Sequence, residues 1–124
     1  MTDGSRAAAP LSIVTAQPEA GTVRVHLAGE VDLATSGQLR VALLAVVAAA
    51  APSTHVRVDL AQVTFIDAGG IGVLIRARAA AHRAGVGFSV HNPRGIVRRV
   101  IDVLDLTDML RVTPVRPASP SSQP

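Results

Sequence analysis

The sequence contains no cysteine, lysine, tryptophan or tyrosine, and its only aromatic residues are Phe65 and Phe88. Without cysteine, the chain cannot form disulfides, use a thiolate nucleophile or bind zinc through sulfur. Every basic residue is arginine, these arginines are scattered along the chain, and the net charge is only +3. Nucleic-acid binders usually cluster basic charge and stack bases on aromatic rings, so we expect no direct contact with nucleic acid.

Long apolar runs are also missing. The longest, VALLAVVAAAA from Val41 to Ala51, is too short to cross a bilayer, and the first ten residues lack the apolar segment of a signal peptide. We therefore expect no membrane insertion and a soluble, cytoplasmic protein. The 124 residues suffice for one domain, and a hydrophobic content of 48% favours a packed core built from Val, Leu, Ile and Ala.

The two ends of the chain differ from its middle. Residues 1–9 are small and polar, and residues 114–124 are rich in proline and serine without periodicity. These compositions predict a flexible N-terminus and a disordered tail. Residues 10–113 between them form the predicted domain.

Strands are predicted from alternating apolar residues. Val23, Val25 and Leu27 alternate with polar residues, which favours a half-buried strand that pairs with residues 11–16 in a hairpin. Gly21 and Gly29 are expected in the turns on either side of it. Further strands are predicted at residues 55–60 and 86–92, with a short edge strand within residues 111–115.

Three helices are predicted between these strands. The first covers residues 35–50, with Thr35 and Gln38 at the spacing of a capping box, and it should be well covered because it is apolar nearly all round. The second covers residues 71–85, and its buried face contains Ile71, Leu74, Ala77 and Ala81. The third has Pro93 in its first turn, and its inward residues are Ile96, Val97, Val100 and Leu104. This order predicts an α/β fold with a mixed sheet, whose later strands are joined by right-handed crossovers.

The segment FIDAGG, residues 65–70, ends a predicted strand with an acidic residue, a small residue and two glycines. It carries no hydroxyl, thiol or imidazole, so Asp67 is interpreted as the cap of the next helix rather than as a catalytic base. Gly69 and Gly70 could cradle a phosphate at the helix start, but neither a GxGxxG motif nor a P-loop lysine accompanies them.

No other constellation indicates catalysis. The histidines at positions 26, 55, 82 and 91 lack the spacing of metal ligands and are interpreted as surface or strand residues. The acidic residues at positions 102, 105 and 108 lack the pattern of a calcium loop. We therefore predict no catalytic residues, no metal and no cofactor, and a binding module rather than an enzyme.

Three segments together resemble the STAS domain, in particular bacterial anti-sigma factor antagonists. They are GEVDLATSGQL, the run VRVDLAQVTFIDAGGIGVLIRARAAAHRAG, and NPRGIVRRVIDVLDLTDML. The resemblance extends from about Leu11 to Val112. It implies a STAS-like mixed β-sheet of four to five strands flanked by three to four α-helices.

The resemblance also implies a function. Such antagonists bind an anti-sigma factor with a histidine-kinase-like ATPase domain, and binding releases the sigma factor for transcription. The kinase phosphorylates a Ser or Thr at the turn after the F-x-D strand, which blocks binding, and a phosphatase reverses the modification. By this resemblance the protein is a monomer when free.

Transferred residue by residue, the resemblance predicts a partner surface without its usual switch. Asp67 and Gly70 match the turn, whereas the phosphoacceptor position is Gly69 and the residue before it is Ala68. The predicted partner-binding residues are Asp32, Thr35, Asp67, Ala68, Gly69, Gly70, Gly72 and Arg76. Because Gly69 has no hydroxyl, the turn should stay in its binding-competent state.

Two other functions stay open. A STAS accessory subunit of a membrane transporter ATPase, of the lipid-transport type, also needs no phosphorylatable turn. A nucleotide-binding enzyme is the third alternative, and no phosphate-binding loop supports it.

Overall fold

The structure is a computed structural model that describes residues 10–113. The flexible N-terminus predicted for residues 1–9 and the disordered tail predicted for residues 114–124 lie outside the described residues. The elements are β1 (Ser12–Glu19), β2 (Thr22–Val31), α1 (Ser36–Ala49), β3 (His55–Ile66), α2 (Ala68–Arg83), β4 (Gly87–His91), α3 (Gly95–Val103) and β5 (Val112–Thr113).

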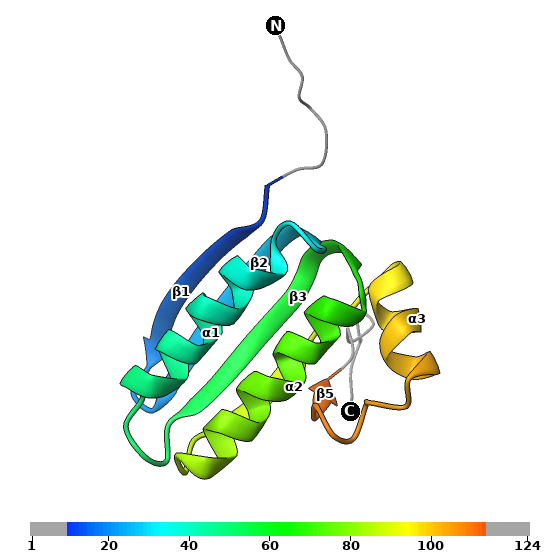
Figure 1. The fold of residues 1–124 in the computed structure, drawn as a ribbon. Helices are drawn as coiled ribbons and strands as arrows, with labels where there is room; N and C mark the ends of the chain where they lie inside the picture. Colours follow the sequence, from blue (N-terminus) through cyan, green and yellow to red (C-terminus); the bar gives the residue numbers. More distant parts are fainter. Residues whose placement is uncertain (1–9, 114–124) are drawn as a thin grey trace, which may run out of the picture.

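The strands form one mixed sheet in the order β1-β2-β3-β4-β5. The β1–β2 hairpin is antiparallel, and every other neighbouring pair is parallel. In Figure 1, α1 and α2 lie side by side across one face of this sheet, while α3 lies beyond α2. The predicted α/β class, strand number and helix number are confirmed.

The core lies between the sheet and the helices. Because side chains alternate along a strand, Val56, Val58 and Leu60 of β3 share one face, and all three are fully buried. The predicted face of α2 is confirmed, since its buried residues include Ile71, Leu74, Ala77 and Ala81. A core of Val, Leu, Ile and Ala is also found, with Phe88 as its one aromatic member.

Two predictions at the first helix are wrong. Its start is correct, but Thr35 makes no side-chain cap bond, because its hydroxyl donates to the Glu30 carbonyl at 2.8 Å. Gln38 likewise does not reach back to the helix start, because its amide donates to the Leu11 carbonyl. The helix is also less covered than predicted, since Val41 is 62% exposed.

The strand predictions err in length and in one turn. The strand predicted at residues 55–60 continues to Ile66, along the full length of β2. Gly29 does not follow β2 but lies inside it, with φ at 112°, where the pairing register with β3 shifts. A Cβ at Gly29 would lie 2.6 Å from the Pro10 carbonyl oxygen, so close backbone approach explains this glycine.

The third helix is shorter than predicted. Pro93 precedes it instead of lying in its first turn, and the helix ends at Val103. Val97 and Ile101 are buried, whereas Ile96 and Leu104, both predicted to face inward, are each 48% exposed. The short predicted edge strand is confirmed as β5.

The face of the sheet opposite α1 and α2 carries a polar network across β3 and β4. The Ser89 hydroxyl lies 2.7 Å from Nε2 of His55 and 2.7 Å from Nε2 of His91. Arg57 Nε donates to the same His91 nitrogen at 3.3 Å. An arginine cannot accept, so His91 Nε2 is the acceptor; Ser89 then donates to it and accepts from His55 Nε2. These hydrogen bonds therefore fit two neutral rings.

Burial lowers the pKa of His55 and of His91 below the ordinary value of 6.5, and the Arg57 guanidinium lowers both further. Arg111 also lowers the pKa of His55. For His91, the nearby His55 and Arg24 lower the pKa, whereas Asp59 raises it. The unfolded chain therefore binds more protons than the folded one as the pH falls below about 6.5. The contribution of the neutral rings to the free energy of unfolding is therefore fully present above that pH. It is lost as the pH falls toward the lowered pKa values.

We expect the free energy of unfolding to decrease as the pH is lowered from about 7.5 to about 5.5. Urea denaturation followed by circular dichroism measures this slope. The double variant His55→Gln/His91→Gln should have a flatter profile, because it lacks both titrating rings. His82→Gln is the matched control, since the exposed His82 ring is outside the network. An equal slope in wild type and double variant would contradict this origin of the pH dependence.

Candidate partner-binding site

The predicted partner residues are brought together by the parallel pairing of β2 and β3. Val31 pairs with Ile66 at the ends of these strands, and the Asp67 amide donates to the Val31 carbonyl at 3.1 Å. Residues 32–35 join β2 to α1, and Asp67 alone joins β3 to α2, so the starts of the two helices lie at the same end of the molecule (Figure 1). A Cβ at Gly69 would lie 4.0 Å from the Ser36 hydroxyl, which shows how closely the two helix starts approach.

The first loop, residues 32–35, is held by its own polar side chains. The Asp32 carboxylate accepts from the backbone amides of Ala34 and Thr35 at 3.0 and 3.2 Å. The Thr35 hydroxyl accepts from the Asp32 amide and donates to the Glu30 carbonyl. Asp32 and Thr35 therefore shape the loop, and their atoms are largely occupied by contacts within it.

The second turn, residues 67–70, starts α2. Asp67 is the N-cap, and its carboxylate accepts from the Gly70 amide at 2.9 Å, as predicted. An aspartate here also places negative charge at the positive end of the helix dipole. Ala68 and Gly69 are exposed, so the backbone of this turn is open to a partner.

The two glycines of the turn have different surroundings. Gly70 is buried, and a Cβ there would lie 2.5 Å from Cγ1 of Val31 and 2.8 Å from Cγ1 of Ile66. A Cβ at Gly69 would meet only the Asp67 carboxylate, at 3.3 Å, and the Ser36 hydroxyl. Gly70 is therefore required by packing, whereas position 69 has room for a side chain at the surface.

Gly72 and Arg76 lie four residues apart on α2, and therefore on neighbouring turns of one helix face. Arg76 is exposed, and nothing lies within 4 Å of where a Gly72 Cβ would be. The structure thus groups the loop, the turn and the start of this face at one end of the molecule. We call these residues, Asp32 to Thr35, Asp67 to Gly70, Gly72 and Arg76, the partner surface.

Leu33 at the tip of the first loop was not predicted as part of this surface. Its side chain is 91% exposed between Asp32 and Thr35. A large apolar side chain in such a position contributes contact area to an interface without having to move. The sequence signal that could have found it is a leucine inside a loop whose neighbours are polar or small.

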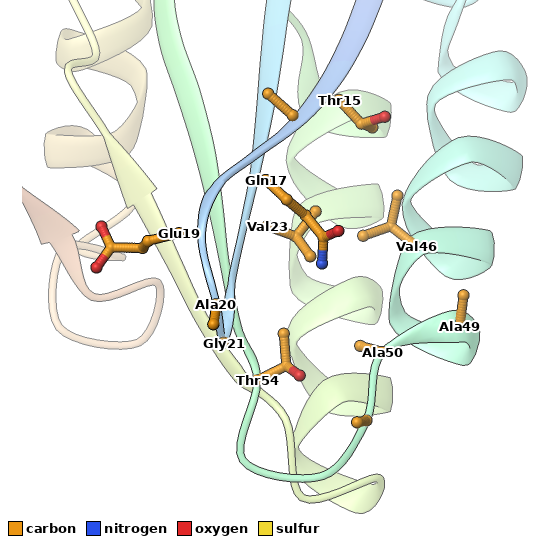
Figure 2. A pocket seen from close by; sticks show the side chains of 12 residues that line it. Thr15, Gln17, Glu19, Ala20, Gly21, Val23, Val46, Ala49, Ala50 and Thr54 are labelled. Atoms are coloured by element: carbon orange, nitrogen blue, oxygen red, sulfur yellow. The ribbon is translucent and has the colours of Figure 1, made fainter.

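One cavity lies away from the two loops of the partner surface. It has a volume of about 930 Å³ and lies between the tip of the β1–β2 hairpin and the end of α1. Figure 2 shows Gln17, Val23 and Val46 facing one another there, while the Glu19 carboxylate points away. No set of charged groups converges on this space, so we assign it no chemistry.

Residues 10–113 contain neither a candidate metal cluster nor a candidate membrane-spanning helix. Within that range, no group of three or more His, Cys, Asp or Glu side chains is arranged to hold a metal ion. None of the helices described is long and apolar enough to cross a membrane.

One family model and several solved structures are similar to this chain. A family model described as "Mlab, STAS domain" matches residues 14–112. The crystal structure of an anti-sigma factor antagonist from Mycobacterium paratuberculosis is similar, with 27% identity, a TM-score of 0.73, and coverage of 85% of this chain and 86% of that one. No curated protein sequence matches.

Two further solved structures share the fold at lower identity. The anti-sigma factor antagonist SpoIIAA in its unphosphorylated form is 20% identical, with a TM-score of 0.67 and coverage of 86% of this chain and 90% of SpoIIAA. The murine anion transporter Slc26a9 is 21% identical, with a TM-score of 0.68 over 82% of this chain. This match covers only 17% of the transporter, so there the fold is one part of a larger chain.

Proposed function

This chain belongs to the STAS domain family, and from that premise we propose that it is an anti-sigma factor antagonist. Its partner would be an anti-sigma factor with a histidine-kinase-like ATPase domain. Binding at the partner surface would release the sigma factor and thereby regulate transcription indirectly, in the cytoplasm and without contact to nucleic acid. The likeness to the antagonist from Mycobacterium paratuberculosis over most of both chains is the observation that carries this proposal.

The geometry of the partner surface supports a binding role. Its two loops are fixed by internal hydrogen bonds, so little ordering would be needed when a partner docks. Exposed Ala68 and Gly69 allow close approach of a partner backbone, and Leu33 and Arg76 on either side supply an apolar and a charged contact. We propose that the free protein is a monomer that presents this surface.

We further propose that the turn is not controlled by phosphorylation. A phosphate carries a charge of about −1.5 to −2, and at position 69 it would lie beside the Asp67 carboxylate at the surface that the partner must cover. Gly69 has no hydroxyl to carry it. The antagonist would therefore remain competent to bind while its partner holds ATP.

The test starts from capture of the partner out of the native cytosol, followed by purification of the captured protein. If that partner is a soluble kinase-like ATPase, it is incubated with the antagonist and ATP, and the product is analysed by intact mass and peptide mapping. We expect no phosphate on residues 58–76, a tryptic peptide whose only hydroxyl is Thr64, and unchanged affinity. Phosphorylation of Thr64 or Ser36 that abolishes binding would overturn the unswitched antagonist.

A second function is favoured by two observations. The fold also occurs as part of an anion transporter chain, and the matching family model is not described as an anti-sigma factor antagonist. A STAS accessory subunit of a membrane transporter ATPase, of the lipid-transport type, would equally need no hydroxyl at Gly69. Recovery of a transporter ATPase in the capture experiment, in place of a soluble kinase, would support this function and contradict the first.

A further inference from the structure

A second pocket lies at the start of β4, at the end of the parallel strands opposite the partner surface. Its volume is about 270 Å³. Four of its seven lining residues are basic, none is acidic, and the basic ones are His55, Arg78, His82 and Arg111. We call it the β4-edge pocket.

The basic side chains reach the pocket from three directions. Arg78 and His82 are four residues apart on α2 and so project from one helix face, while Arg111 comes from the residue before β5. His55 begins β3 and pairs with Gly87 of β4. A Cβ at Gly87 would lie 2.5 Å from Nδ1 of His55, so this glycine leaves space for the imidazole.

The exposed edge of β4 adds a backbone donor. The amides of Val90 and Asn92 point away from β3 and donate to the carbonyls of Leu110 and Thr113. Because donors on one side of a strand recur every second residue, the Phe88 amide points to the same edge. The ladder with β5 begins only at Val90. Phe88 lines the pocket and precedes this ladder, so its amide lies on the pocket side of β4.

Compensation of the α2 helix end does not account for these cations. The last carbonyls of α2 already accept backbone hydrogen bonds from Ala84, Gly85 and Val86. Within residues 10–113, neither Arg78 nor Arg111 has a carboxylate within ion-pair distance. The charged groups that act on His55 are likewise cationic, namely Arg57 and Arg111. The pocket therefore concentrates positive charge that no described carboxylate neutralises.

We propose that the β4-edge pocket binds a phosphomonoester, with Arg78 and Arg111 on the phosphate oxygens and the Phe88 amide as a further donor. Guanidinium groups match phosphate geometry with paired N–H donors, and such charge-assisted bonds are the stronger kind. The volume suits a small ligand whose phosphate enters the pocket. The pocket lies at the opposite end of the parallel strands from the two loops of the partner surface, and this binding does not depend on the proposed function.

His55 connects the pocket to the polar network on the sheet. Its Nε2 donates to Ser89, so the neutral ring leaves Nδ1 as an acceptor beside Gly87. A bound phosphate would favour protonation of Nδ1, because the added charge would then be neutralised by the anion. A protonated His55 would then add a further cation beside the phosphate oxygens.

The test uses inorganic phosphate as the probe and the full-length chain. Phosphate is titrated at about pH 6 into isotopically labelled protein, and backbone amide shifts are followed, with sodium chloride at matched ionic strength as the salt control. We expect saturable shifts centred on Phe88, Gly87 and Arg111. The affinity should fall about tenfold or more in Arg78→Gln/Arg111→Gln.

Arg40→Gln is the matched control, because it removes a guanidinium from the exposed face of α1, away from the pocket. It should bind phosphate like the wild type. Shifts that never saturate, that sodium chloride reproduces, or that persist in the Arg78→Gln/Arg111→Gln variant would overturn the proposal. A loss of binding caused by unfolding is recognised from the amide spectrum of that variant without phosphate.

A second experiment distinguishes two sources of the phosphomonoester, a lipid headgroup and a soluble ligand. Vesicles of phosphatidylcholine with or without phosphatidic acid are sedimented with the wild type and with Arg78→Gln/Arg111→Gln. Sedimentation that requires both phosphatidic acid and the two arginines supports the pocket as a lipid-headgroup site. Saturable phosphate binding without sedimentation supports it as a site for a soluble phosphomonoester.

Discussion

Replacement of Gly70 by alanine is expected to lower the free energy of unfolding by about 1–3 kcal/mol, as overpacking of a tight core does. The added Cβ would lie 2.5 Å from Val31 Cγ1 and 2.8 Å from Ile66 Cγ1. Both neighbours are buried at the ends of adjacent strands, so neither can move aside without disturbing the core. Urea denaturation of the variant and the wild type measures the difference.

Gly72→Ala is the matched control on the same helix. Nothing lies within 4 Å of a Cβ at Gly72, and its φ is not positive. Because glycine is a poor helix former, this variant should be stabilised by up to about 1 kcal/mol. Equal effects of the two substitutions would show that the contact of the added Cβ with Val31 and Ile66 does not lower the free energy of unfolding.

The same contact has a consequence for the site. Gly70 allows the first turn of α2 to lie directly against the ends of β2 and β3, which brings the turn at residues 67–70 beside the loop at residues 32–35. A larger residue would move the helix start away from the sheet and so separate the two loops. The buried glycine therefore positions the surface, whereas exposed Gly69 is free to form part of it.

Features determined by the local sequence were predictable. Asp67 is predictable as a cap because the first amides of a helix have no acceptor within the helix. An aspartate directly before the helix supplies one. The buried face of α2 followed from helical spacing, since the charged residues leave only one apolar side. The adjacency of the two loops came from the resemblance, and the pairing of Val31 with Ile66 gives its physical basis.

Features set by tertiary contacts were not predictable in the same way. Thr35 satisfies every local rule for a capping box, but the Glu30 carbonyl at the end of β2 takes its hydroxyl. Ile96 and Leu104 are each four residues from Val100, yet the orientation of α3 buries Val97 and Ile101 instead. Gly29 resembles a turn residue until the approach of the Pro10 carbonyl is known. The cations of the β4-edge pocket come from distant parts of the sequence and share no motif.

The proposed antagonist should lose its partner when a negative charge is placed at position 69. Gly69→Asp puts a carboxylate beside that of Asp67, on the exposed turn that the partner would cover. Like charges placed together within an interface weaken it strongly, so we expect the dissociation constant to rise about tenfold to a hundredfold. Isothermal titration calorimetry with the purified partner measures the change.

Gly69→Asn separates the charge from the added bulk, because asparagine has nearly the same shape as aspartate. A Cβ at this position meets the Asp67 carboxylate at 3.3 Å in both variants, so any local adjustment is shared. An aspartate in the first helical turn is favourable to the helix itself, so Gly69→Asp should remain folded. Gly69→Asn should therefore bind far better than Gly69→Asp. Equal weakening by both would show that bulk alone blocks docking, and equal wild-type affinity would place the partner elsewhere on the molecule.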